Sequence, residues 1–192
     1  NFTSMGANTF TIRNRGMGIR LGKEGKKPKT YKRISYREAK GFKESFGQHN
    51  IVSISAWMSG AASLKYKSQK TDPNIRVWGS DENYLATSGY EIAEGRNFTI
   101  DEINLGQPVI IIGSEVKEEL FGEESALGKV ISAGSKKFRI IGVLNSKGSS
   151  IGFSGDKTVI VPIDIGRQFI ETKLSYTLST TVKDTYLLDA AI

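Results

Sequence analysis

A short apolar run near the middle of the chain, Val109-Ile-Ile-Ile112, constrains the fold more than any other feature. Gly113 follows it directly and is a residue that commonly starts a turn. Consecutive apolar residues bounded by a glycine are typical of a buried strand that runs into a turn. The sequence therefore predicts a buried strand at the centre of the fold.

The residues after this strand predict a short helix. Ser114 is placed to cap a helix over residues 115–121, because serine side chains accept hydrogen bonds from the first N–H groups of helices. Val116 and Leu120 are four residues apart and therefore share one face of that helix. Gly122 suits the left-handed conformation that commonly ends a helix.

Further strands are predicted on both sides of this helix. A second apolar strand covers residues 138–143, so residues 76–143 are expected to contain a strand–helix–strand–strand unit with no chemical group at its centre. Residues 51–79 are expected to form a long strand or hairpin with one solvent-exposed face. Residues 158–162 predict another strand, and residues 163–172 predict a short helix.

The two ends of the chain carry strands of the same kind. Residues 8–13 and residues 176–182 both alternate apolar and polar side chains, as half-buried strands do. We expect these two strands to pair in one sheet, with the central stretch inserted between them as a separate small domain.

Two helix starts carry the capping-box pattern, in which a Ser or Thr precedes a Glu by three residues. The first is Ser35 with Glu38, and its helix is expected to end at Gly47. The second is Thr99 with Glu102.

Length and composition exclude several classes of protein. A chain of 192 residues is long enough for one ordinary domain or two small ones. No apolar run approaches the roughly 20 residues that a bilayer-spanning helix needs. The chain has no cysteine, which excludes disulfides and thiolate metal sites. Because the sequence begins at Asn1 and not at a methionine, we expect a segment of a longer protein whose membrane-spanning parts lie outside it.

The formal net charge of +7 is concentrated in one region, because residues 13–43 hold twelve of the 27 Lys and Arg residues and only two acidic ones. Such a region can contact anionic lipid or an acidic partner, or it can be a solvated loop and helix face. Nucleic acid is not expected as a partner, because no recognised binding module accompanies the region and no aromatic residues are interleaved through it. The candidate contacts to a partner or a membrane surface are Arg13, Arg15, Lys26, Lys27 and Lys29.

Nothing in the sequence indicates an enzyme, a cofactor or a metal. His49 is the only histidine, and a lone histidine after a helix end is more often a surface or capping residue than a base. No Ser-His-Asp set can be built without it. The adjacent acids Asp101 and Glu102, or Glu123 and Glu124, are more typical of solvated charges at helix starts than of a catalytic pair. We therefore expect a non-enzymatic protein.

An ordered set of short motifs, none specific alone, resembles a known family over nearly the whole chain. The motifs are Gly6-Ala-Asn-Thr-Phe-Thr-Ile12, Val77-Trp-Gly-Ser-Asp-Glu-Asn-Tyr84, Glu94-Gly-Arg-Asn-Phe98, Val109-Ile-Ile-Ile-Gly113, Leu120-Phe-Gly122, Leu127-Gly-Lys129, Phe138-Arg-Ile-Ile-Gly-Val143 and Val161-Pro162. Together they are similar to the MacB-like periplasmic domain of ABC transporter permeases of the MacB/FtsX type.

The resemblance implies an α+β fold with two lobes. A porter-like βαβ lobe would be formed by both chain ends, residues 1–79 and 174–192, with its C-terminal part truncated. A small α/β lobe of the Sabre type would be inserted between them as residues 80–173. The basic loop over residues 14–30 is not part of the shared pattern.

The resemblance also implies a function without catalytic or nucleotide-binding residues. The domain would lie on the periplasmic face of the inner membrane and transmit movement from cytoplasmic ATP hydrolysis to substrate efflux or release. Its partners would be the transmembrane helices of the same permease, a second permease subunit in a homodimer or heterodimer, the cytoplasmic ATPase and a periplasmic adaptor. The alternative is a soluble binding module that uses residues 13–43 for anionic lipid or an acidic partner.

Overall fold

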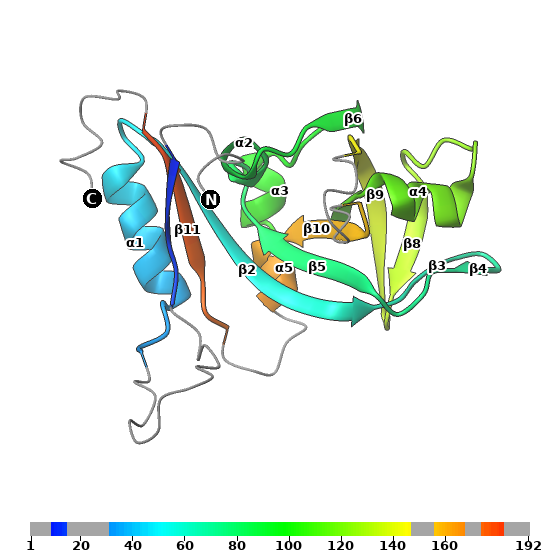
Figure 1. The fold of residues 1–192 in the computed structure, drawn as a ribbon, viewed down its shortest axis with the longest axis horizontal. Coiled ribbons are helices and arrows are strands. Elements are labelled where there is room, and N and C mark those ends of the chain that lie inside the picture. The colour runs from blue at the N-terminus through cyan, green and yellow to red at the C-terminus, as the bar shows by residue number, and fades with distance from the viewer. Residues whose placement is uncertain (1–8, 15–30, 147–155, 168–173, 183–192) are drawn as a thin grey trace, which may run out of the picture.

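The structure, a computed structural model, describes residues 9–14, 31–146, 156–167 and 174–182. Within these residues, eleven strands form one hydrogen-bonded sheet with helices against it, which confirms the expected α+β class (Figure 1). The strands are β1 (Thr9–Ile12), β2 (Ile51–Ala62), β3 (Leu64–Tyr66), β4 (Gln69–Lys70), β5 (Ile75–Ser80), β6 (Ile92–Gly95), β7 (Val109–Ile112), β8 (Val130–Ala133), β9 (Lys136–Leu144), β10 (Thr158–Pro162) and β11 (Thr177–Thr181). The helices are α1 (Tyr36–Phe46), α2 (Tyr84–Ser88), α3 (Ile100–Asn104), α4 (Ser114–Phe121) and α5 (Ile163–Arg167).

The strands lie in the order β1-β11-β2-β5-β10-β7-β9-β8-β3-β4, with β6 paired to β9 off this path. β1 and β11 pair antiparallel, which confirms that the two chain ends meet in one sheet. In β1 the ring of Phe10 is partly buried and packs edge-to-face against Phe46 of α1, while Ile12 is 37% exposed. Ile12 shares the face of Phe10, because residues two apart in a strand project to the same side, but its side chain is more exposed.

Helix α1 forms as its sequence predicts. The Ser35 side chain accepts a hydrogen bond from the Glu38 amide, and the Glu38 carboxylate accepts one from the Ser35 amide. Ala39 is fully buried, while Phe42 and Phe46 are partly buried against the core, and Gly47 ends the helix. The second capping box, at α3, also forms as predicted.

Strand β2 connects the region of the chain ends with the rest of the sheet. Its first half pairs with β11 and its second half pairs with β5. The second half contains register shifts between Trp57 and Ser59 and between Ser59 and Ala62, so Gly60 lies in an irregular part of the strand. The chain then continues into the β3–β4 hairpin, which pairs with β8. Residues 51–79 are thus extended, as predicted.

The central strand β7 is buried on both faces, as its apolar run predicts. Val109 and Ile111 belong to a core that also contains residues of α1, β2 and β11. Ile110 and Ile112 belong to a second core with α4, β8 and β9. Because side chains alternate along a strand, these two cores lie on opposite faces of the sheet.

The start of α4 differs from the prediction. Gly113 occupies the N-cap position, Ser114 is the first helical residue, and no side-chain cap bond forms. Gly113 donates a backbone hydrogen bond to the Thr158 carbonyl at 2.8 Å, and a Cβ at position 113 would lie 2.0 Å from the Asp156 carbonyl oxygen. The close approach of the neighbouring chain therefore requires glycine at the cap. Gly122 has the expected positive φ of 55°, but its ψ of −120° lies outside the left-handed helical region.

The predicted lobes share one sheet, because β5 and β10 pair in parallel over five residue pairs, four of which join residues 1–79 to residues 80–173. The division into two lobes stays a prediction.

Helix α5 covers the first half of the predicted helix at residues 163–172, and residues 168–173 lie outside the described part. In the described residues, no helix is long and apolar enough to cross a membrane.

Candidate functional surfaces

The candidate contact residues chosen from the sequence are only partly placed by the structure. Arg13 follows β1, is exposed, and forms no ion pair with an acidic residue that the structure describes. Arg15, Lys26, Lys27 and Lys29 lie outside the described residues. This set of contacts therefore stays a prediction.

Two lysines of the same basic region are neutralised within the protein. Lys32 Nζ lies 2.6 Å from a carboxylate oxygen of Glu38, on the exposed side of α1. Lys43 Nζ lies 2.8 Å from Asp81 and 2.7 Å from Glu82. Glu38 is one of the two acidic residues already counted in residues 13–43, so only the pairing of Lys43 with Asp81 and Glu82 reduces the positive charge below what the sequence indicates.

The contacts of Lys43 form an ionic connection between three elements, which we call the Asp81 joint (Lys43, Ile54, Asp81 and Glu82). Asp81 lies between β5 and α2 and is 4% exposed. Its carboxylate accepts hydrogen bonds from the Ile54 amide at 2.7 Å and from the Asn83 amide at 3.2 Å, in addition to Lys43. The joint therefore ties α1 to β2 and to the end of β5.

Burial and neighbouring charges shift the pKa values of Asp81 and Lys43 in opposite directions. Burial of the Asp81 carboxyl raises its pKa to about 6, although the Lys43 ammonium and the Ile54 amide favour the charged form. Burial alone would lower the pKa of Lys43, but Asp81 and Glu82 outweigh it and the pKa is raised. Lys43 thus stays protonated, while the pKa of Asp81 lies much closer to neutral pH than that of an ordinary aspartate.

The residues considered for catalysis are dispersed or already engaged. His49 is exposed after the end of α1. Glu102 is buried, and Arg96 donates to both of its carboxylate oxygens, at 2.7 and 2.8 Å. Hydrogen bonds from Arg96, despite the opposing effect of burial, lower the pKa of Glu102 to about 2. Its neighbour Asp101 is exposed, so these acids do not form a catalytic pair. Among the described residues, no group of three His, Asp or Glu side chains is arranged to hold a metal ion.

An apolar groove of about 520 Å³ lies beside the bulged half of β2. Its lining includes Met58, Ala62, Val77, Phe138 and Val161. This volume is within the range of small-molecule sites, and the lining can accept an apolar group. Sequence reasoning missed the groove. Its only local signal is the run of small residues Ser59-Gly-Ala-Ala-Ser63, which leaves space against the sheet.

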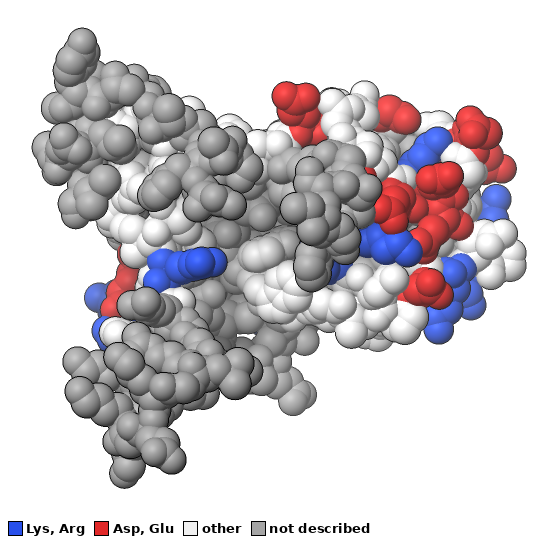
Figure 2. All heavy atoms as spheres, in the orientation of Figure 1, with Lys and Arg blue, Asp and Glu red and all other residues white. Residues whose placement is uncertain are grey.

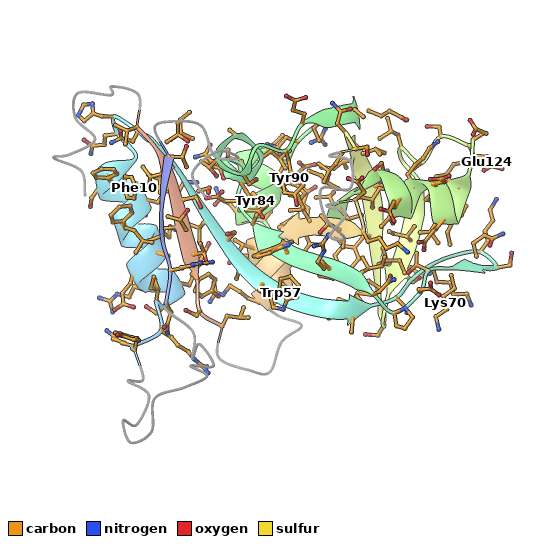
Figure 3. The ribbon with its side chains drawn as sticks, in the orientation of Figure 1. Phe10, Trp57, Lys70, Tyr84, Tyr90 and Glu124 are labelled. Atoms are coloured by element: carbon orange, nitrogen blue, oxygen red, sulfur yellow. The ribbon has the colours of Figure 1, made fainter. Side chains whose placement is uncertain are left out.

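Acidic side chains gather over α4, at the end of the molecule away from α1 (Figure 2). They are Glu115, Glu118, Glu119, Glu123 and Glu124. Lys157 neutralises part of this charge, with its Nζ 2.7 Å from Glu119 and 3.9 Å from Glu115. In Figure 3, Glu124 and Lys70 mark this same end of the molecule, far from Phe10.

Comparison with known proteins identifies the family to which the chain belongs. Residues 1–192 match the family model described as the MacB-like periplasmic core domain. The macrolide export ATP-binding/permease protein MacB of Vibrio parahaemolyticus is 30% identical over 163 residues, which are 84% of this chain and 23% of that protein. MacB of Neisseria gonorrhoeae is 29% identical over 182 residues, covering 94% of this chain and 26% of that protein.

Solved structures share the fold. The periplasmic region of MacB from Actinobacillus actinomycetemcomitans has a TM-score of 0.73 at 19% identity and covers 100% of this chain and 83% of that one. The extracellular domain of the noncanonic ABC-type transporter YknZ has a TM-score of 0.64 at 24% identity and covers 82% of this chain and 78% of that one.

These relatives define the chain as a periplasmic domain of a MacB-like ABC transporter permease. The chain belongs to the family of MacB-like periplasmic core domains. It spans about a quarter of the length of the curated relatives that it matches.

Proposed function

We propose that this domain has two roles. It transmits conformational change from cytoplasmic ATP hydrolysis to substrate efflux or release, and it binds a periplasmic adaptor. It performs no reaction itself. One observation carries the proposal. A single hydrogen-bonded sheet connects β1 and β11, the strands nearest the two chain ends, with the β3–β4 hairpin at the opposite end of the long axis (Figure 1).

A continuous sheet with a packed core on each face suits the transmission of movement. Close-packed interiors deform little, so a displacement imposed at one end reaches the other end without being absorbed. The Asp81 joint supports this role, because it ties α1 to the strand that runs between the two ends. The domain then follows its attachment points as a stiff body.

The proposed setting is the periplasmic face of the inner membrane. The chain ends would continue into transmembrane helices of the same permease, which would pair with a second permease subunit and with a cytoplasmic ATPase. We retain in the proposal a porter-like lobe of residues 1–79 and 174–192 and an inserted lobe of residues 80–173. Supporting this division, the terminal strands β1 and β11 pair with each other.

The test uses spin labels in the intact permease. The chain has no cysteine of its own, so labels can be placed at Lys40 on α1 and Ser68 in the β3–β4 turn, both exposed. Doubly labelled permease is diluted with unlabelled permease, and distances are measured without nucleotide and with ATP bound. We expect the distance within the domain to stay constant, while the distance from Ser68 to a label in the cytoplasmic ATPase changes.

Two results would overturn the proposal. If the distance between Lys40 and Ser68 changes with nucleotide, the domain is not a stiff body. If neither distance changes, the domain does not follow ATP hydrolysis. The alternative, a basic module for anionic lipid, predicts that the isolated chain binds anionic vesicles in a strongly salt-dependent way.

A further inference from the structure

Three lysines lie in one row across four strands at the end of the molecule away from α1. Lys70 of β4 is directly opposite Lys65 of β3. Lys65 is opposite Ser132 of β8, and Ser132 is opposite Lys137 of β9. Residues directly opposite one another project from the same face of a sheet, so these three ammonium groups share one face. With strands about 4.8 Å apart, the row extends over about 14 Å.

Arg139 extends this row. It is two residues beyond Lys137 on β9 and is therefore on the same face. It is opposite Val130 of β8, whose side chain is 47% exposed. We call Lys65, Lys70, Lys137 and Arg139 the basic strip. It combines four exposed cations with an adjacent exposed apolar side chain.

The basic strip and the acidic helix α4 lie on opposite faces of the sheet. Phe138 and Ile140, which alternate with the strip residues of β9, pack in the same core as Val116 and Leu120 of α4. The strip residues therefore point away from α4. None of the four strip residues forms an ion pair with an acidic side chain in the described part of the chain.

The fold gains no stability from this arrangement of lysines. Like charges directly opposite each other in a sheet are destabilising. A further lysine, Lys67, occupies the turn between β3 and β4 with a φ of 51°, a conformation that favours glycine or asparagine. Lys67 has a contact within the fold, because its Nζ lies 5.0 Å from the centroid of the Tyr66 ring. Cross-strand pairing does not explain why Lys65 and Lys70 face each other.

We propose that the basic strip is a docking surface for an acidic segment of a protein partner. The proposal rests on the proposed function and gives the docking role a surface and a partner chemistry. A row of glutamates along one face of a helix presents carboxylates about one turn apart, a spacing comparable to that of neighbouring strands. Val130 would supply an apolar contact beside the ion pairs.

Two other occupants fit the position less well. In the proposed function a membrane surface would face the end that contains β1 and β11, and the strip lies at the other end of the long axis (Figure 1). A second copy could bring its acidic α4 to the strip only head to tail, because the two surfaces face opposite ways. Such a head-to-tail contact does not close into a two-fold dimer and generates a ring or an open chain of molecules.

The first test is binding of a 21-residue peptide with glutamates along one helical face, measured by fluorescence anisotropy against the 192-residue chain at several salt concentrations. The variant is Lys65→Glu with Lys137→Glu. The matched control is Arg37→Glu with Lys40→Glu, two exposed cations of α1. We expect the strip variant to weaken binding at least tenfold and the control less than twofold, with a shallower salt dependence for the strip variant. Equal weakening by both variants would overturn the proposal.

The second test identifies the occupant in the intact permease. A photo-crosslinking residue replaces Ser132, which lies between Lys65 and Lys137 without contributing charge. A crosslink to an acid-rich segment of another protein, abolished by the strip variant, supports the proposal. A crosslink to lipid or to a second copy of the chain overturns it, and so does the absence of any crosslink. The distance measurements between Lys40 and Ser68 do not depend on the strip, so failure of docking and failure of coupling are distinguishable.

Discussion

The Asp81 joint and the basic strip are both built from charged residues, but they differ in what the fold requires of them. In the joint, Lys43 meets two carboxylates, and the Asp81 side chain is 5% exposed. In the strip, Lys65 and Lys70 face each other in solvent, and the described residues offer them no counter-charge. The joint stabilises the structure internally, whereas the strip leaves its charge available to another molecule.

This difference indicates how the two ends of the domain are specialised. The end that contains β1 and β11 fixes α1 to the sheet by buried polar contacts, as expected of a segment that must move with its attachment points. The other end presents charge on both faces, acidic over α4 and basic on the strip. The comparison leads to four predictions, ordered by expected effect.

The largest effect is expected at Gly113, beside β10. Gly113→Ala places a Cβ 2.0 Å from the Asp156 carbonyl oxygen, so the backbone itself must move. We expect a loss of roughly 4 kcal/mol in the free energy of unfolding, measured by urea denaturation. The control is Gly41→Ala in α1, where no atom lies within 4 Å of the added Cβ. This change should stabilise the helix by about 0.7 kcal/mol. Similar losses for both variants would contradict the close approach at Gly113.

The joint is tested by Asp81→Ala. The substitution leaves the Ile54 amide without its acceptor and removes one of the two carboxylates that neutralise Lys43. Breaking a buried ion pair by removing one partner is strongly destabilising, and we expect a loss of roughly 3 kcal/mol in the free energy of unfolding. Glu82→Ala is the control. The Glu82 side chain is 23% exposed, so we expect a loss below about 1 kcal/mol. A larger effect at Glu82 would show that Asp81 is not the centre of the joint.

The pH dependence of the joint follows from the raised pKa of Asp81. Its pKa is about 6 in the native state and 3.8 in the reference state, so the native state binds the proton more tightly. The wild-type protein should therefore gain stability relative to Asp81→Asn as the pH falls from 7 to 4, by about 2 kcal/mol. Urea denaturation of both proteins across this range measures the difference. A difference that shrinks as the pH falls would mean that Lys43 and the backbone amides outweigh burial.

The sequence predicts those features of the fold that depend on residues close together in the chain. The capping boxes at Ser35 and Thr99 involve residues three apart, and both form. The buried strand at Val109–Ile112 follows from its own composition. The cap of α4 does not follow from the local sequence. The backbone carbonyl of Asp156, which is remote in sequence, leaves room only for glycine at position 113.

The surfaces depend on residues that are distant in the chain, so the sequence indicates neither the joint nor the strip. Lys43 and Asp81 are separated by 38 residues. The strip combines the β3–β4 hairpin with β9, and only the strand register places Lys65 and Lys137 on either side of Ser132. The basic excess at residues 13–43 is obvious in the sequence, but two of its lysines are neutralised by carboxylates, one of them remote.

The smallest predicted effect tests the strip directly. Lys65→Glu replaces a repulsive pair with an attractive one across from Lys70, and it also removes the repulsion between Lys65 and Lys137. We expect the free energy of unfolding to rise by about 0.5 kcal/mol, with part of the gain lost at high salt. Lys40→Glu is the control, and it should change stability by less than this because Lys40 lies on the exposed face of α1. A variant that is more stable yet binds the acidic peptide more weakly would separate the requirements of folding from those of docking. If Lys65→Glu destabilises the protein, Lys65 has a structural role and the contrast with the Asp81 joint does not hold.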